Sequence, residues 1–179
     1  SMIKKYLVAL AIAVFAAACG STEKLSDQYS GFDLGNYKNY DFFEITGPEN
    51  PEPGFEENIK FLESKISEAL ASRGLSQSSD KPELKLNLGI VVEDKVQTRT
   101  TSLATDPFMY SGQRSYTWES REVPVNTYKE GTLTMHIVDA ATNTVVWAGT
   151  ASRVLPKKNE KKQKAAQEAV AELFEQIDN

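Results

Sequence analysis

Cys19 is the residue whose chemistry the sequence identifies most directly. It is the only cysteine in 179 residues, so the chain can form neither an internal disulfide nor a cysteine-based metal site. It follows three alanines at positions 16–18, which end an apolar run that starts after the basic positions 4 and 5. A basic start, a short apolar run and small residues before a cysteine resemble the bacterial lipobox, in which the thiol is acylated. Residues 1–18 are therefore predicted to be a lipoprotein signal peptide that is removed, and Cys19 to be lipidated.

Lipidation at Cys19 implies attachment to a membrane through acyl chains, palmitate among them. The apolar run Tyr6–Ala18 is itself too short to cross a bilayer of roughly 30 Å as a helix. Two or more acyl chains anchor a protein stably, since each buried methylene contributes about 0.8 kcal/mol. Residues 19–36 contain few apolar side chains, a composition typical of flexible segments. We therefore expect a lipidated cysteine and flexible tether at 19–36, in the bacterial cell envelope.

Side chains that could catalyse a reaction are scattered rather than grouped. His136 is the only histidine, and it alternates with apolar residues on the polar side of a predicted strand. The chain has no Gly-x-Ser-x-Gly motif, no Gly-rich phosphate loop, no calcium loop and no zinc spacing. Neighbouring carboxylates on a strand point to opposite faces, so they cannot act on one substrate. Carboxylate pairs occur at Glu56 with Glu57, Glu93 with Asp94, and Glu119 near Glu122, and we interpret them as solvated charges. We expect no enzymatic activity, no cofactor and no metal.

The charge balance argues against nucleic-acid partners. Loss of residues 1–18 removes Lys4 and Lys5 from 20 basic residues against 25 acidic ones, so the net charge changes from −5 to −7. An acidic protein is repelled by phosphate backbones. One basic cluster remains, which we interpret as the solvated start of a helix, or alternatively as a patch for anionic lipid headgroups. Its members are Lys157, Lys158, Lys161, Lys162 and Lys164.

Residues 37–179 are predicted to form a single domain of mixed helices and strands. Alternating or aromatic-rich apolar runs predict strands at 37–45, 84–99, 128–139 and 144–154, with a turn at 140–143 joining the last two. Apolar spacings of three and four predict a helix from Phe55 to Leu70, ended by Gly74. A second helix with an apolar stripe is predicted to begin at a capping Asn159 and to reach Ile177.

These elements predict an α+β fold. Helices with a single apolar stripe and a sheet with one apolar face bury their apolar surfaces most simply by packing against each other. The expected result is a two-layer sandwich with a mainly antiparallel four-stranded sheet and two helices on one face, in the order β-α-β-β-β-α.

The segment 98–124 is unusually rich in aromatic side chains for a connection. If the flanking strands continue beyond the core, the segment becomes the tip of a long hairpin. Tyr and Trp suit contact surfaces that are both apolar and wettable. The alternative is that the aromatic residues fold back over the open face of the sheet as a satellite cluster. The candidate partner-binding residues are Phe108, Met109, Tyr110, Tyr116 and Trp118.

Several local motifs resemble a family of bacterial lipoproteins, the domain-of-unknown-function family numbered four-one-three-six. The matching stretches are Tyr40-Asp41-Phe42, Gly74-Leu75 followed by Pro82-Glu83-Leu84, Gly131 to Asp139, and Thr144 to Gly149 with its glycine after Trp147. The resemblance covers residues 37 onwards and implies an α+β envelope lipoprotein of bacteria with two membranes. Gly20 after the lipidated cysteine is compatible with sorting to the outer membrane.

Three functions are compatible with these features. The first is a membrane-tethered binding or assembly module for an envelope partner protein. The second is a periplasmic protein that binds a small molecule, lipid or glycan between the helices and the sheet. An apolar cavity behind Leu88, Ile90 and Trp147 would favour it. The third, a hydrolase, requires convergent titratable groups that the sequence does not show.

Overall fold

The computed structural model describes residues 24–100 and 122–179. The predicted signal peptide and the lipidation site Cys19 lie outside this range. So do the five candidate partner-binding residues, Phe108, Met109, Tyr110, Tyr116 and Trp118.

The described chain contains two α-helices, two short 3-10 helices and five strands. In chain order they are η2 (Leu25–Tyr29), η3 (Leu34–Asn36), β1 (Asn39–Thr46), α2 (Phe55–Ala71), β2 (Ser76–Gln77), β3 (Leu84–Thr100), β4 (Glu122–Asp139), β5 (Thr144–Leu155) and α3 (Asn159–Asp178). All predicted helices and strands are present, and β4 begins earlier than the pattern of residues 128–139 suggested.

The sheet is five-stranded and mixed, which corrects the prediction of a mainly antiparallel four-stranded sheet. Its order is β2-β1-β3-β4-β5, with β1 parallel to both β2 and β3 and the remaining pairs antiparallel. Helix α2 brings the chain back along the sheet, so β3 starts at the same end as β1 and runs parallel to it. The extra strand β2 lies where a turn was expected, because the Ser76 N–H donates to Lys38 O at 3.0 Å and the Ser78 N–H donates to Tyr40 O at 2.8 Å.

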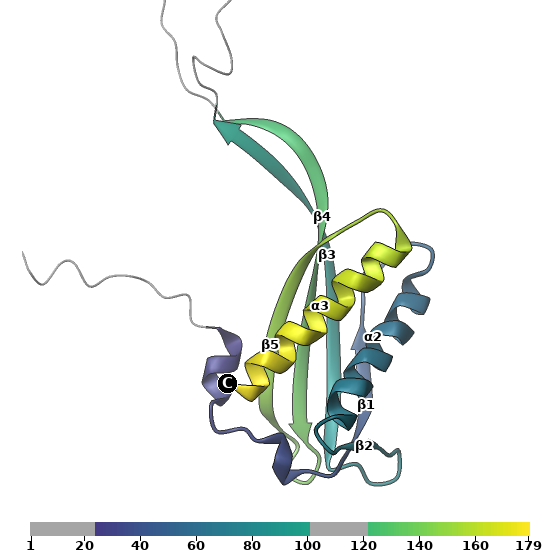
Figure 1. Ribbon diagram of the computed structural model, residues 1–179, viewed down its shortest axis with the longest axis vertical. Coiled ribbons are helices and arrows are strands. Elements are labelled where there is room, and N and C mark those ends of the chain that lie inside the picture. The colour runs from purple at the N-terminus through teal and green to yellow at the C-terminus, as the bar shows by residue number, and fades with distance from the viewer. Residues whose placement is uncertain (1–23, 101–121) are drawn as a thin grey trace, which may run out of the picture.

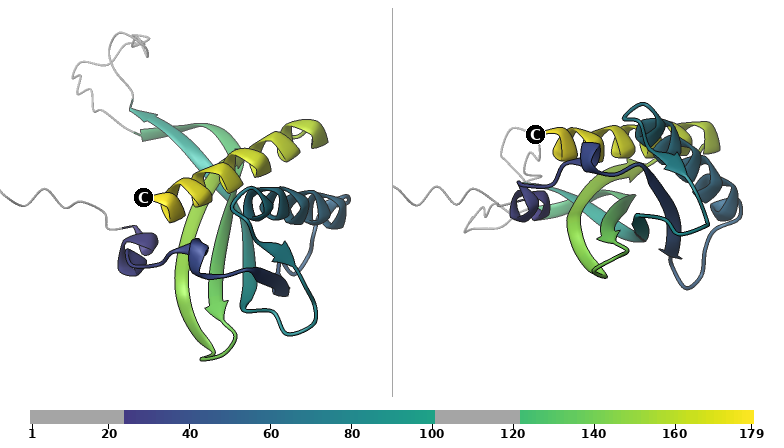
Figure 2. Two further views of the ribbon diagram at one scale, coloured as in Figure 1. Left: turned by 60° about the horizontal axis from the view of Figure 1, so that its bottom comes forward. Right: turned by 90° about the horizontal axis from the view of Figure 1, so that it is seen from below.

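Both helices cover the same face of the sheet, as predicted, and form a second layer in front of it (Figures 1 and 2). The core lies between the layers and is contributed by one face of each element. Its largest fully buried side chains are Trp147, Tyr40, Ile66, Leu70, Leu84, Leu86, Leu88, Met135, Ile137 and Leu173. The α+β two-layer architecture is therefore confirmed.

The end of α2 follows the sequence signal, whereas the start of α3 does not. Gly74 has a φ of 86°, and its N–H donates to Ala71 O while the Leu75 N–H donates to Leu70 O. These are the two bonds of a Schellman motif, and the buried Leu75 completes it. The N-cap of α3 is Lys158, without a side-chain capping bond, so the prediction that Asn159 caps this helix is wrong.

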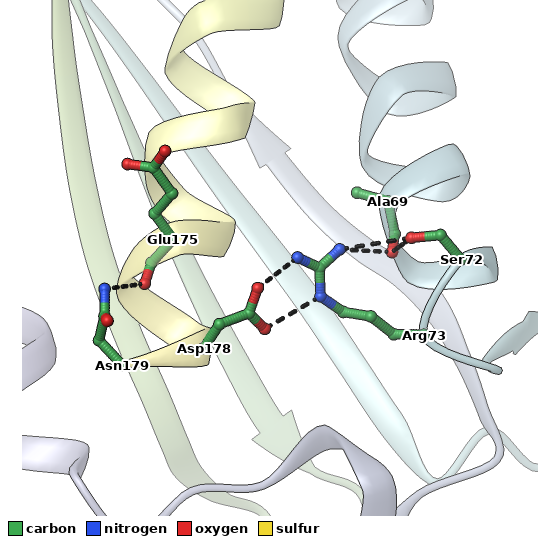
Figure 3. A network of polar contacts seen from close by, with 6 residues as sticks. All are labelled: Ala69, Ser72, Arg73, Glu175, Asp178 and Asn179. Carbon is green, nitrogen blue, oxygen red and sulfur yellow. Dashed lines mark hydrogen bonds and ion pairs between the residues drawn. The ribbon is translucent and has the colours of Figure 1, made fainter.

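The C-terminal ends of α2 and α3 are joined by the guanidinium of Arg73 (Figure 3). Its Nε and Nη2 donate to the two carboxylate oxygens of Asp178 at 3.1 and 2.5 Å, while Nη1 donates to the carbonyl of Ala69 at 2.9 Å. The same guanidinium lies 4.7 Å from the centre of the Phe174 ring. This bidentate contact holds the helices together at one end.

The segment before β1 packs on the domain, so the predicted flexible tether does not extend through residues 25–36. Two 3-10 helices form here, and Leu34 and Ser26 are buried. Tyr29, Phe32 and Tyr37 pack against the core. Apolar side chains spaced too widely to form a periodic pattern nevertheless anchor this segment, because the rest of the fold supplies the surface that they cover.

Candidate functional site

The antiparallel pair β3–β4 continues well beyond the rest of the sheet. Pairing of β5 with β4 stops at Leu155 opposite Lys129, and pairing of β1 with β3 stops at Thr46 opposite Gly89. The two strands nevertheless remain paired as far as Thr100 opposite Glu122. We call the two-stranded part, residues 95–100 with 122–128, the arm. At about 3.3 Å per residue it projects roughly 20 Å from the domain (Figure 1).

The arm exposes apolar side chains as well as backbone edges. Val96 is 57% exposed and Val125 is 48% exposed. A two-stranded ribbon is only marginally stable in water, and its edges carry unpaired backbone groups. The candidate residues between positions 108 and 118 belong to the connection between the arm's paired ends and lie outside the described residues. The predicted long hairpin is confirmed as far as Thr100 and Glu122.

Charged residues that sequence analysis singled out do not converge on a catalytic centre. His136 is exposed on the sheet face away from the helices. Glu93 pairs with Lys95 at 2.7 Å, and Asp94 pairs with Lys129 at 3.3 Å, so each carboxylate has its own basic partner. Within residues 24–100 and 122–179, no group of three His, Cys, Asp or Glu side chains could hold a metal ion. In the same residues, neither helix is long and apolar enough to span a membrane.

A pocket of about 240 Å³ lies between the two helices and the sheet, beside the root of the arm. Helix α2 lines it with Phe55, Ile59 and Leu62, and strands β3 and β4 contribute Ile90 and Leu133. The loop 47–54 between β1 and α2 closes one side through two of its three prolines, Pro48 and Pro53. The interior is therefore mainly apolar, as in small-molecule sites.

The pocket exists because the side chains on the apolar stripe of α3 are smaller near the start of the helix than near its end. The first three turns of this helix present three alanines to the pocket, at positions 165, 166 and 169. The second half presents Leu173 and Phe174, which are buried in the core. Large side chains and the Arg73–Asp178 contact close the space between the helices at their C-terminal ends, whereas the alanines leave space between the N-terminal ends.

Charged side chains surround the pocket's mouth. The lining includes three cations, Lys129, Arg153 and Lys162, but a single carboxylate, Glu52. Glu52 accepts a hydrogen bond from Lys162 Nζ at 2.8 Å and lies 3.7 Å from Lys129 Nζ. The hydrogen bond and charge of Lys162, with a smaller effect of Lys129, hold the pKa of Glu52 below its ordinary value. Glu52 therefore remains a carboxylate that ties the loop to α3 and β4.

Two polar side chains of the lining, Arg153 and Asn58, differ in whether their polar atoms have partners. Arg153 pairs with two carboxylates of α3: its Nη1 donates to Glu172 Oε2 at 2.5 Å, and its Nε lies 3.9 Å from Glu168 Oε2. Asn58 on α2 also lines the pocket, and its Oδ1 is buried without a hydrogen-bond partner. A buried acceptor without a donor is costly, so this oxygen would gain from a hydroxyl or water inside the pocket.

A second hollow, of about 630 Å³, lies between η2, η3 and the C-terminal end of α3. Backbone and polar side chains such as Asp33 and Gln176 line much of it, and one edge is formed by Lys24, the first described residue. Its lining also includes charged side chains that already have partners: Arg73 and Asp178 pair with each other, and Asp27 and Asp33 accept hydrogen bonds from backbone N–H groups.

Sequence analysis found part of the pocket and missed the rest. A cavity behind Leu88, Ile90 and Trp147 was the feature that would favour a ligand-binding protein, but only Ile90 lines this pocket, while Leu88 and Trp147 are buried in the core. Lys162 was interpreted as a solvated residue of the basic cluster, yet it lies at the pocket's mouth and pairs with Glu52. The alanines at the start of α3 were the available signal, because small residues on an apolar stripe leave space.

Comparison with known families identifies a match over most of the chain. A family model described as "Domain of unknown function (DUF4136)" matches residues 25–177. The match starts at the beginning of η2, earlier than the resemblance seen in the sequence from residue 37. No curated protein matches the chain.

Several solved structures share features of the fold at low identity. A PelC dodecamer from Paraburkholderia phytofirmans has 14% identity and a TM-score of 0.46, with 82% of this chain and 91% of that chain covered. Lipoprotein GNA1162 from Neisseria meningitidis has 9% identity and a TM-score of 0.41, with 77% and 98% covered. A PDZ domain protein from Parabacteroides distasonis has 16% identity and a TM-score of 0.44; 76% of this chain is covered, but the chain spans only 31% of that protein. At these values the similarities carry no conclusion about function.

Proposed function

The chain belongs to the DUF4136 family, and we propose that it is an envelope lipoprotein that acts as a membrane-tethered binding or assembly module for an envelope partner protein. The observation that carries this function is the arm. A ribbon about 20 Å long, with exposed valines and with edges that pair with no other strand among residues 24–100 and 122–179, contributes little to the stability of its own domain. Such a ribbon gains stability when a partner packs on its faces or pairs with an edge.

The edges of the arm are unequal in their capacity to pair with another strand. On the β4 side, Pro124 lies within the arm and lacks a backbone N–H. On the β3 side, residues 90–100 extend beyond β1 without a proline. The β3 edge is therefore the better template for an added strand.

Lipid anchoring at Cys19 places the module at a membrane surface. In this proposal the acyl chains hold the mature protein in the bacterial cell envelope, with the outer membrane as the expected destination. Cys19→Ala should release the mature chain into the soluble envelope fraction, measured by fractionation and immunoblotting. Retention of the variant in the membrane fraction would refute lipid tethering.

In-cell crosslinking followed by purification and mass spectrometry tests the partner-binding role. We expect one reproducible envelope protein with the wild type, and its loss when Tyr110, Tyr116 and Trp118 are changed together to Ser. A matched pair of single variants tests the arm itself, since Val96 and Val154 are both 57% exposed. Val96→Lys, on the arm, should reduce crosslinking, whereas Val154→Lys, on β5, should not. Equal crosslinking by these two variants would contradict a contact at the arm.

A periplasmic small-molecule or lipid binder is the second candidate, and the pocket is the observation that favours it. The apolar lining makes a glycan the least suitable of the ligands considered, because sugars need many polar partners. We propose no enzymatic role: the exposed His136 and the individually paired carboxylates Glu93 and Asp94 form no cleft of convergent titratable groups. A hydrolase therefore ranks last.

A further inference from the structure

The pocket has a chemical character that goes beyond a generic binding site. Its interior is formed by apolar side chains from both helices and three strands, and its mouth by basic side chains. We infer that it binds a single-chain anionic amphiphile, a medium-chain fatty acid, with the chain inside and the carboxylate at the mouth. This inference rests on the second function proposed above and names its ligand class.

The size of the pocket selects a single chain. Pockets for drug-sized ligands span about 300–1,000 Å³. At about 240 Å³, this pocket is smaller, so it has room for one acyl chain but not for a two-chain lipid. The three alanines of α3 and the side chains of Ile59, Leu62 and Leu133 form walls that offer apolar contact along the chain.

The charge at the mouth selects an anion. Lys129, Arg153 and Lys162 line the pocket against the single carboxylate of Glu52, in a chain whose net charge is −5. The other acidic partners of these cations do not line the pocket: Asp94 pairs with Lys129, and both Glu168 and Glu172 pair with Arg153. A carboxylate headgroup must therefore compete with them as well as with Glu52. The lining is thus locally basic in an acidic protein and complementary to a carboxylate headgroup.

Glu52 occupies the position that the headgroup would take. Its carboxylate lies between Lys162 and Lys129, at 2.8 and 3.7 Å, and is carried by a surface loop rather than by a helix or strand. A fatty acid that enters must compete with this carboxylate for the two lysines. Glu52 therefore competes with the ligand's carboxylate for Lys129 and Lys162. When the ligand displaces Glu52, the loop 47–54 loses its contact with α3.

The competition makes an unusual prediction. Glu52→Gln removes a carboxylate from the site and should tighten binding of a fatty acid about three- to tenfold, because the lysines are then free to pair with the ligand. Lys162→Gln should weaken binding by a similar factor. A purely structural role for Glu52 predicts the opposite for Glu52→Gln, since a loosened loop would leave the pocket less well formed.

A pair of alanine substitutions on α3 separates the pocket from the rest of the helix. Ala166 lines the pocket, whereas Ala171 is exposed on the other face of the same helix. Ala166→Leu fills the site and should weaken binding at least about tenfold, while Ala171→Leu should leave it unchanged. If Ala166→Leu perturbs folding, the charge variants at Glu52 and Lys162 still test the inference, because neither side chain belongs to the buried core.

The experiment is titration of the mature chain with sodium decanoate by calorimetry and by amide NMR. Cys19→Ala is present in every sample, so that neither a covalent acyl chain nor detergent competes. Decyltrimethylammonium, with the same chain and the opposite charge, is the matched probe and should bind at least about tenfold more weakly. Saturable decanoate binding that shifts pocket amides and follows the four variants supports the inference.

Three outcomes would overturn it: no decanoate binding, equal binding by Ala166→Leu and Ala171→Leu, or equal binding of the two probes. If Glu52→Gln binds decanoate as tightly as the wild type or more weakly, the ligand's carboxylate does not lie between Lys129 and Lys162. Crosslinking to a protein partner is a separate measurement, so loss of the arm hypothesis and loss of the ligand hypothesis are distinguishable.

Discussion

Position 149 on β5 requires glycine, because the ring of the buried Trp147 occupies the space that a Cβ would need. A Cβ at position 149 would overlap Trp147 Cη2 and lie 2.8 Å from Cζ2, closer than such atoms can approach. Trp147 is only 1% exposed, so its ring cannot swing away without disturbing the core. The Trp-Ala-Gly sequence of this strand is thus a packing requirement rather than a binding motif.

Gly149→Ala should consequently destabilise the domain. Overpacking of a filled core costs about 1–3 kcal/mol. For a domain of this size, each kcal/mol shifts the melting temperature by roughly 2–4 °C, so we expect Tm to fall by about 2–12 °C. Urea unfolding followed by circular dichroism gives the corresponding loss in the free energy of unfolding.

Gly89 provides the matched control on β3. A Cβ there would meet Thr46 Oγ1 at 3.6 Å and Thr134 Cβ at 3.9 Å, both ordinary contacts. Gly89→Ala should therefore be neutral or stabilise by up to about 1 kcal/mol, because alanine loses less conformational freedom on folding. Replacement of glycine by alanine should therefore lower the free energy of unfolding at position 149 and leave it unchanged or raise it at position 89, although both positions lie in one sheet.

A double variant tests the cause. Phe at position 147 lacks Cη2 and Cζ2, so Trp147→Phe combined with Gly149→Ala should cost less than the sum of the single changes. An unchanged Tm for Gly149→Ala, or strictly additive effects in the double variant, would refute the proposed clash.

Three further predictions concern the polar and backbone features of the fold. Gly74→Ala places a Cβ on a residue with φ of 86° and should lower the free energy of unfolding by about 1 kcal/mol in urea denaturation; no loss would show that the Schellman motif does not require glycine. Asp178→Asn removes the bidentate partner of Arg73 and should cost about 0.5–1 kcal/mol, since both side chains are partly exposed, and a double-mutant cycle with Arg73→Gln should return the same coupling. The pKa of Asp178 is held below its ordinary range by the hydrogen bond from Arg73. The pKa of Asp139 is lowered in the same way by hydrogen bonds from the Thr142 and Ala141 amides and the Tyr37 hydroxyl. Their stabilising effect is complete above the unfolded pKa of about 4 and is lost as pH falls through the lower folded pKa, so Asp139→Asn should flatten the stability profile below about pH 4. If the stability of Asp139→Asn falls below pH 4 as steeply as that of the wild type, Asp139 does not have this role.

The sequence by itself determined the features that depend on neighbours along the chain. The apolar stripes of α2 and α3 follow from side chains that recur every three or four residues. The β4–β5 hairpin follows from alternation on both sides of a short turn, and the end of α2 follows from Gly74. The lipidation prediction at Cys19 is of the same kind, since it depends on a short run of adjacent residues.

Only the tertiary structure decided the features that depend on surfaces made by distant residues. The parallel pairing of β1 with β3, the short β2 and the packing of residues 25–36 each require partners remote in sequence. The pocket has the same origin, because the alanines of α3 leave a space only where α2, the sheet and the loop 47–54 surround them. Lys162 shows the difference most simply. Its position in a run of lysines predicts a solvated residue at the start of a helix. The fold, however, places its Nζ 2.8 Å from a carboxylate oxygen of Glu52, in a loop more than a hundred residues earlier in the chain.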